Sequence, residues 1–279
     1  MHAASRVSTG QQYDAISDNF IFTGDAQDFF ETVLTGFDKE DQISIGDMSL
    51  SAGDVRLSVG SLGLRLDTNG DGKVDGVLKL ADPVANATVN VAAGPDGTAI
   101  TLTELAAATD GNDEISGTDG LDYIAGGAGA DMLMGLGGSD ALSGGNGNDR
   151  LDGGAGADWL AGGKGNDAMS GGAGPDVFSF DQRSGNTGAD RIIDFGSDDL
   201  IVTTVRIRDN NKDGVISFGG YKLLDIAGGG KVRVTGDLGD RMLGIEYDGS
   251  FVENSVEYFA YSAVGSAIGV AEVSGGMMG

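Results

Sequence analysis

The sequence contains no cysteine and a single histidine, His2, near its start. Disulfide bonds and thiolate metal sites are therefore excluded, and zinc or haem chemistry is not expected. No run reaches the roughly 18 apolar residues of a transmembrane helix, so we expect no transmembrane segment. The opening residues, MHAASRVSTG, lack the apolar stretch of a cleaved secretory signal, so export by that route is not expected.

Positive charge is also scarce, because 17 Lys and Arg residues stand against 43 Asp and Glu residues, which gives a formal charge of -26. Nucleic acid and anionic membrane surfaces are therefore poor partners. A cation is the expected partner, since bound metal neutralises carboxylates that otherwise repel one another. The 279 residues, 40% of them hydrophobic, are enough for one large domain or two to three small ones.

Glycine and aspartate are abundant in the centre of the chain, where they recur with a period of nine. Eight units run from Ala108 to Ser179 without an insertion or deletion, for example GGAGADWLA and GGKGNDAMS. A flexible linker has no reason to keep such a register. Position six carries a carboxylate in every unit: Asp113, Asp122, Asp131, Asp140, Asp149, Asp158, Asp167 and Asp176.

Position eight of every unit is a large apolar residue. Its place between two other residues at the end of the unit suits a very short strand with one buried face. One apolar residue cannot form a core, so we expect the units to stack. The first six positions then turn the chain, and glycine there lets the backbone approach an ion. The expected inner row comprises Ile115, Ile124, Leu133, Leu142, Leu151, Leu160, Met169 and Phe178.

The pattern GGxGxDxUx resembles the RTX nonapeptide repeat family and covers 72 of the 279 residues. The resemblance implies a right-handed parallel β-roll with two units per turn, hence four turns. Calcium would lie between motifs two units apart, at about six internal sites. It also implies that the protein leaves a bacterium by type I export and folds outside the cell or at its surface. Beside the aspartates, the implied calcium ligands are the carbonyls of Gly127, Gly129, Gly145, Gly147, Gly154, Gly156, Gly163 and Gly165.

The repeat departs from the family pattern where other residues replace glycine, at Ala108, Thr109, Thr118 and Leu136. These departures lie in units one, two and four. We therefore expect less complete calcium sites at the N-terminal end of the coil, but no interruption of the coil itself.

Two further acidic loops have the form DxNxDG. The alternating oxygen ligands of an EF-hand-like loop converge on a hard cation, and its glycine allows the sharp turn. Both loops lack the carboxylate at position twelve, and the same residues also suit a plain hairpin turn. The candidate calcium ligands are Asp67, Asn69, Asp71 and Asp75 in the first loop, and Asp209, Asn211 and Asp213 in the second.

Residues 20–43 align with residues 178–201 at a constant offset of 158, which predicts two copies of one β module. The second copy contains DRIIDF, which resembles the D-x-I-x-D-F segment that follows the coil in serralysin-type proteases and alginate epimerases. That resemblance implies a cap on the coil, which an exposed apolar row and open strand edge require.

We therefore predict an all-β chain, with a right-handed parallel β-roll flanked by two β-rich capping modules. An N-terminal arm spans residues 1–18 and a β-rich module residues 19–107. The β-roll spans residues 108–179 and a β-rich cap residues 180–279. The last run, SVEYFAYSAVGSAIGVAEVSGGMMG, suits a final strand pair or an uncleaved C-terminal secretion signal.

No catalytic site is predicted, because the 107 residues before the coil contain neither HExxH nor GxSxG. A structural protein that assembles with copies of itself in a surface layer, filament or biofilm matrix is the first hypothesis. Outward residues suited to lateral contacts are Tyr123, Met132, Met134 and Trp159.

The second hypothesis is a carbohydrate-binding or adhesin module for extracellular polysaccharide. The basic residues that would favour an acidic glycan are sparse: Arg150, Lys164, Arg183 and Arg191. The third is a pore-forming protein, which the absence of a long amphipathic or apolar region disfavours.

Overall fold

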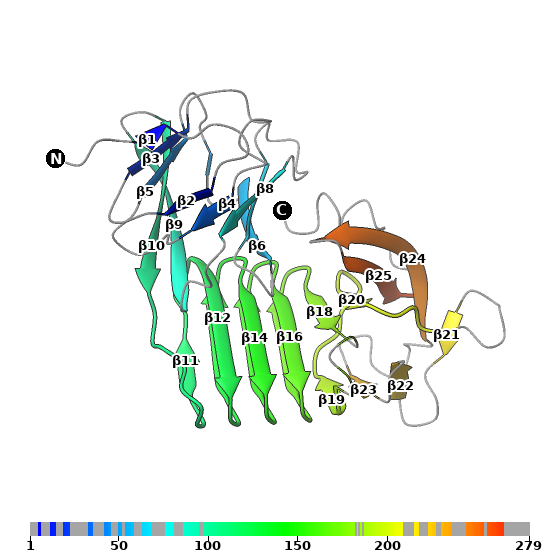
Figure 1. The fold of residues 1–279 in the computed structure, drawn as a ribbon. Helices are drawn as coiled ribbons and strands as arrows, with labels where there is room; N and C mark the ends of the chain where they lie inside the picture. Colours follow the sequence, from blue (N-terminus) through cyan, green and yellow to red (C-terminus); the bar gives the residue numbers. More distant parts are fainter. Residues whose placement is uncertain are drawn as a thin grey trace.

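β-strands form the regular secondary structure of the chain (Figure 1). Among the described residues there is no α-helix, so none of them belongs to a helix of the length and apolarity needed to cross a membrane. The computed structural model describes residues 5–6, 12–14, 19–22, 33–35, 42–45, 50–51, 54–58, 63–67, 76–80, 86–94, 97–181, 183, 185, 187–208, 215–217, 223–226, 230–235, 244–253 and 256–264.

The repeat region folds into two facing parallel sheets, and the eight units alternate between them. Each strand pairs in parallel with the strand two units away, so Leu142 stands beside both Ile124 and Leu160. The expected parallel β-roll of four turns is therefore confirmed. One sheet contains β12 (Leu121–Ala128), β14 (Ala141–Asn146), β16 (Trp159–Lys164) and β18 (Val177–Phe180), and the other β11 (Glu114–Ser116), β13 (Met132–Gly137), β15 (Arg150–Ala155) and β17 (Ala168–Ala173).

The strands of the roll are longer than the three residues that the sequence pattern predicts. Parallel pairing continues into the first three positions of the next unit, as in the pair Gly127 and Gly145. Most strands are therefore six residues long, and only positions four to six turn the chain. The predicted strand length was too short because glycine has a low strand propensity. Hydrogen bonds between stacked turns overcome that low propensity.

The inner row is confirmed, because all eight apolar residues at position eight are at most 1% exposed. They belong to one cluster that continues past Phe178 into Ile192, Phe195 and Ile201 of the C-terminal region. Burial of such a side chain contributes about 1.5–3 kcal/mol. The roll and the region after it therefore share one hydrophobic core.

The N-terminal region extends one sheet of the roll and also forms a separate five-stranded sheet. Its hairpin of two long strands pairs antiparallel with β12, with Val89 opposite Leu121. The strands are β1 (Ser5–Arg6), β2 (Gln12–Asp14), β3 (Asn19–Phe22), β4 (Val33–Thr35), β5 (Gln42–Ile45), β6 (Val55–Ser58), β7 (Gly63–Leu66), β8 (Gly76–Leu80), β9 (Ala87–Gly94) and β10 (Gly97–Glu104).

The C-terminal region covers the opposite edge of the roll (Figure 1). Its last strand, residues 256–263, pairs antiparallel with two strands that precede the run, so the described part of the run supplies one strand of the expected pair. Residues 265–279 of that run lie outside the described residues. The strands are β19 (Ala189–Ile192), β20 (Leu200–Thr203), β21 (Val215–Ser217), β22 (Leu223–Ile226), β23 (Gly230–Val234), β24 (Gly244–Glu253) and β25 (Val256–Ala263).

The duplicated segments have the same strand pairing. Phe20 of β3 stands opposite Ile43 of β5, and Phe178 of β18 stands opposite Ile201 of β20, both in parallel pairs. The next neighbours also correspond, because β5 pairs with the β9–β10 hairpin as β20 pairs with the β24–β25 hairpin. The chain therefore contains the same arrangement of parallel strands and capping hairpin twice.

Two outward residues of the roll are buried by these flanking regions. Tyr123 is 8% exposed and packs in a cluster with N-terminal residues. Trp159 is 2% exposed and packs with residues of β20 and β24. Both side chains point outward from the coil as expected, but the flanking regions cover them, so neither lies on a surface suited to lateral contacts between protein molecules. Met132 and Met134 on the other sheet remain partly exposed.

Candidate metal centre

The position-six aspartates form two hydrogen-bonded ladders, one along each of the two rows of turns that join the facing sheets. In both, the backbone N–H of one aspartate donates to Oδ1 of the aspartate 18 residues later, at 2.8–2.9 Å. Every carboxylate except those of Asp113 and Asp122, which begin the two ladders, is therefore fixed in orientation by the preceding turn. One ladder contains Asp113, Asp131, Asp149 and Asp167, and the other Asp122, Asp140, Asp158 and Asp176.

The second carboxylate oxygen has no protein partner in six of these residues. The Oδ2 atoms are fully buried and accept no hydrogen bond from the described residues. A buried carboxylate oxygen without a partner is costly, which indicates that a cation belongs beside it. The six residues are Asp131, Asp140, Asp149, Asp158, Asp167 and Asp176.

Burial raises the pKa of several ladder carboxyls. Loss of hydration raises the pKa of Asp140 and of Asp176 to about 9. The same cause raises the pKa of Asp158 to about 7 and that of Asp167 to about 6. The backbone N–H bonds oppose this shift, and neighbouring carboxylates add to it. The ladders therefore favour a bound proton or a bound cation over a bare negative charge.

The predicted glycine ligands lie in the loops between these aspartates. All eight have positive φ, for example 105° at Gly145 and 144° at Gly147. Their carbonyls point toward the next turn, because a Cβ on Gly147 would overlap the carbonyl oxygen of Gly129, and one on Gly145 that of Gly127. Glycine at positions two and four therefore leaves room for carbonyl oxygens between the turns.

Together these oxygens are a suitable donor set for calcium. Calcium takes six to eight oxygen ligands from carboxylates and carbonyls. No group of three His, Cys, Asp or Glu side chains gathers within the described part of the chain. Backbone carbonyls would therefore have to complete each site, as the repeat pattern predicts. The individual ligands remain predictions.

The first two units differ from the others, as their missing glycines suggest. Thr109 donates from its backbone N–H and its hydroxyl to Asp113, and Thr118 donates in the same way to Asp122. Thr88 of β9 also donates to Asp122. Protein donors thus occupy both of these carboxylates, so Asp113 and Asp122 fit a calcium ion less well than the other six.

Both ladders extend into the C-terminal cap, which the sequence analysis did not foresee. Asp167 donates its N–H to Oδ1 of Asp190, and Asp176 to Oδ1 of Asp199, each at 3.0 Å. Burial raises the pKa of both cap carboxyls to about 7. The nine-residue pattern does not predict this continuation, because the spacing is 23 residues instead of 18. Two features of the sequence could have indicated it: the motif DRIIDF, and Asp199, which aligns with Asp41 in the duplicated segment.

Asp194 supports the last loop of the roll from the cap. Its carboxylate accepts hydrogen bonds from the N–H groups of Gly171 and Gly172, and from the hydroxyl of Ser170. The motif DRIIDF thus contacts the final turn through its two acidic residues, and its Ile192 and Phe195 are fully buried.

Of the candidate ligands in the two DxNxDG loops, only Asp67 lies among the described residues. Asp67 follows β7, is 3% exposed and donates its backbone N–H to the carbonyl of Asp54. All other candidate ligands of both loops lie outside the described residues: Asn69, Asp71, Asp75, Asp209, Asn211 and Asp213.

Comparison with known proteins agrees with this geometry. Residues 108–142 and 143–178 each match the family model of the RTX calcium-binding nonapeptide repeat (4 copies). No curated protein matches the chain. Among solved structures, the extracellular lipase LipA from Serratia marcescens is similar, at 16% sequence identity and a TM-score of 0.33. The alignment covers 85% of this chain but only 38% of the lipase, and nothing about activity follows from it.

Proposed function

Because residues 108–178 are RTX calcium-binding nonapeptide repeats, we propose that this chain is a secreted structural protein. It folds when it binds calcium and then assembles with copies of itself outside the cell, in a surface layer, filament or matrix. The observation that carries the calcium-dependent part is the set of six buried carboxylate oxygens without a protein partner.

The proposed ligands are these six Oδ2 atoms and the carbonyls of glycines at positions two and four. Bound calcium supplies the positive charge that the buried carboxylates lack. The chain's own part is to hold the ligands ready. The ladder N–H groups fix each carboxylate through Oδ1, and positive φ at the loop glycines directs their carbonyls between the turns.

Calcium-dependent folding follows from the free-energy cost of burying the ladder carboxylates without a cation. Near neutral pH the carboxylates must either take up protons or stay charged and buried, and both oppose the roll. Extracellular calcium sites have dissociation constants of about 0.1–1 mM, and tenfold excess calcium stabilises each by about 1.4 kcal/mol. The chain would therefore be unfolded in calcium-poor cytosol and folded outside, which suits export in an unfolded state.

The duplicated arrangement supports the assembly part of the proposal. Within the chain, the capping hairpin of the first copy pairs with the first turn of the roll through β9 and β12. The roll then leads into the second copy. A contact of the same kind between chains would be heterologous, and heterologous contacts propagate into open filaments or layers.

The calcium part is tested by circular dichroism and isothermal calorimetry of the full chain. We expect β-structure to appear between about 0.1 and 1 mM calcium, with several ions bound per chain, and magnesium to be a poor substitute. A chain that is equally folded in EDTA at pH 7.5 would contradict the proposal.

The assembly part needs a separate measurement. Light scattering and negative-stain microscopy should reveal large particles in millimolar calcium and none in EDTA. A chain that folds with calcium yet stays monomeric would overturn the assembly part and leave the calcium part intact.

A further inference from the structure

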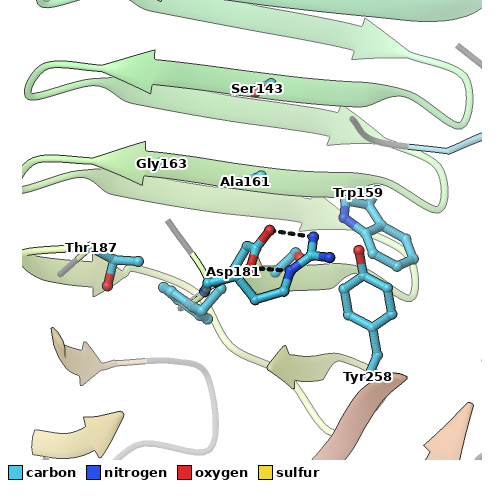
Figure 2. A pocket seen from close by; sticks show the side chains of 10 residues that line it. Ser143, Trp159, Ala161, Gly163, Asp181, Thr187 and Tyr258 are labelled. Carbon is cyan, nitrogen blue, oxygen red and sulfur yellow. Dashed lines mark hydrogen bonds and ion pairs between the residues drawn. The ribbon is translucent and has the colours of Figure 1, made fainter. Parts of the chain in front are cut away.

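A small cavity lies away from the aspartate ladders, on the outer face of the sheet that contains β14, β16 and β18. Its volume is about 200 Å³. The segment after β18 and strand β25 form its other walls (Figure 2). Drug-sized ligands occupy pockets of about 300–1,000 Å³, so this cavity suits something smaller.

Trp159 provides a hydrogen-bond donor in this cavity without a partner. The residue is 2% exposed, and its Nε1 is buried with no hydrogen bond to any described residue. Figure 2 shows the indole nitrogen on the side of the ring that faces Asp181. Because an indole N–H can only donate, a ligand in this cavity would meet it with an acceptor oxygen.

Serine hydroxyl groups from two of the repeat units line the same cavity. Ser143 and Ser179 occupy position nine of units four and eight, with Ala161 of unit six between them. Neither serine hydroxyl hydrogen-bonds to another residue in the described part of the chain. Each can donate one hydrogen bond and accept others.

An ion pair forms one side of the cavity. Arg183 donates from Nε to Oδ1 of Asp181 at 2.9 Å and from Nη2 to Oδ2 at 2.6 Å. Both side chains are partly exposed, at 53% for Arg183 and 40% for Asp181. The guanidinium keeps N–H donors beyond these two bonds. The pair has no net charge, so it favours a neutral polar ligand over an ion.

Tyr258 of β25 supplies an aromatic wall. Its ring meets that of Trp159 edge-on, with the centroids 6.2 Å apart and the planes at 86°. An aromatic surface beside several hydroxyl and N–H donors matches a molecule with C–H groups on its face and hydroxyls around its rim.

We propose that this cavity binds one neutral pyranose unit, either as a free monosaccharide or as the terminal residue of a glycan. The sugar's hydroxyl oxygens accept from Trp159 and Arg183, and its hydroxyl groups exchange hydrogen bonds with Ser143 and Ser179. An acidic sugar is not expected, because the guanidinium of Arg183 is already paired with the carboxylate of Asp181.

The test uses the calcium-loaded full chain, in which Trp159 is the only tryptophan. Methyl glycosides of neutral hexoses and N-acetylhexosamines are titrated while Trp159 fluorescence and the indole N–H resonance are followed. We expect a saturable change with at least one neutral glycoside and none with a uronic acid or with sulfate. An equal response to the anions, or no response to any sugar, would overturn the proposal.

Three variants locate the binding. Arg183→Ala and Ser143→Ala should each weaken binding about tenfold, because each removes a hydrogen bond to the sugar. The matched control Ser116→Ala, which removes an exposed position-nine serine of the other sheet, should bind normally. Unchanged affinity in both cavity variants, with calcium-induced folding intact, would place the sugar elsewhere and overturn the proposal.

The source of the sugar is decided with an oligosaccharide that ends in the best monosaccharide. Tighter binding of the oligosaccharide identifies a glycan terminus as the ligand. Equal or weaker binding identifies the free monosaccharide, and both outcomes support the cavity as a neutral pyranose site.

Discussion

Each of the six aspartates with an unpartnered Oδ2 uses its two oxygens differently. Oδ1 accepts a backbone hydrogen bond that sets the geometry, and Oδ2 faces a space without a protein donor. In Asp113, by contrast, both oxygens accept hydrogen bonds from Thr109. The six carboxylates with an unpartnered Oδ2 are therefore suited to bind a metal, whereas that of Asp113 stabilises a turn. The distinction rests on single atoms, so single substitutions test it.

Asp158→Asn should remove one calcium site while keeping the ladder bond to Asp140, because asparagine retains Oδ1. We expect the number of bound ions to fall by about one and the calcium midpoint of folding to rise. Calorimetry and circular dichroism measure both. Asp152→Asn removes a carboxylate from position nine and is the control; an equal loss in the two variants would contradict the assignment of Oδ2 as a ligand.

Leu136→Gly should stabilise the calcium-loaded protein. Leu136 has φ of 78° and is 49% exposed, and an L-residue in this region costs about 1 kcal/mol or more. We expect a gain of about 0.5–1 kcal/mol in the free energy of unfolding, measured in urea at saturating calcium. Leu136→Ala keeps the same unfavourable φ, so a similar gain in that variant would show that backbone strain is not the cause.

At the scale of elements, the strands of the roll depend on the spacing between successive turns. From the fifth unit on, neighbouring turns approach so closely at positions two and four that a side chain there would overlap a carbonyl oxygen. The C-terminal cap continues this stacking in space. Asp190 and Asp199 accept hydrogen bonds from the N–H groups of the last two position-six aspartates. The roll and its C-terminal cap are therefore one hydrogen-bonded element.

Gly147→Ala should disrupt this stacking. Its Cβ would overlap the carbonyl oxygen of Gly129 at a φ of 144°, so we expect a loss of about 2 kcal/mol or more. Gly111→Ala occupies the same position in the first unit, where the nearest atom to a new Cβ is Oγ1 of Thr109 at 3.4 Å. Urea unfolding in calcium compares them, and similar losses would argue against close stacking as the cause.

Asp199→Ala should weaken the attachment of the cap. It leaves the N–H groups of Asp176 and Gly196 without their acceptor, which costs about 1–3 kcal/mol. The exposed neighbour supplies the control, because Asp198→Ala should change stability by less than about 0.5 kcal/mol. Hydrogen exchange at β18 and β20 should accelerate only in the first variant; unaltered exchange there would mean that the cap is held by packing alone.

At the scale of the whole molecule, the ladders couple folding to protons as well as to calcium. A carboxyl whose pKa is raised in the folded state stabilises that state at low pH, and the contribution is lost as pH rises through the folded pKa. The contribution of Asp140 and Asp176 declines from the ordinary carboxyl pKa up to about pH 9, that of Asp158 up to about pH 7 and that of Asp167 up to about pH 6. Protons and calcium therefore compete for the same buried carboxylates.

In EDTA, we expect the β-structure to be greatest near pH 4, about the ordinary pKa of an aspartate, and to decline until about pH 9, where the last of these carboxyls ionises. In calcium, the midpoint concentration for folding should instead rise as the pH falls. Circular dichroism across this range measures both trends. The double variant Asp140→Asn and Asp176→Asn should lose the part of the decline between about pH 7 and about pH 9, and an unchanged profile would refute the role of these two groups.

The sequence by itself determined the roll. An apolar residue and an aspartate kept in phase through eight units specify which side chain points inward and which stands at the edge, because stacked units repeat the same contacts. The offset between Phe20 and Phe178 likewise predicted a shared module. These features are local and periodic, so they can be read without coordinates.

Only the tertiary structure decided what lies beyond the period. It brought Asp190 and Asp199 into ladders that the change in spacing concealed, and it buried Tyr123 and Trp159, which the repeat alone leaves outside. It also gathered Ser143, Trp159 and Arg183 around one cavity. Contacts between segments far apart in the chain depend on how the caps fold over the sheet, and a nine-residue pattern contains no information about that.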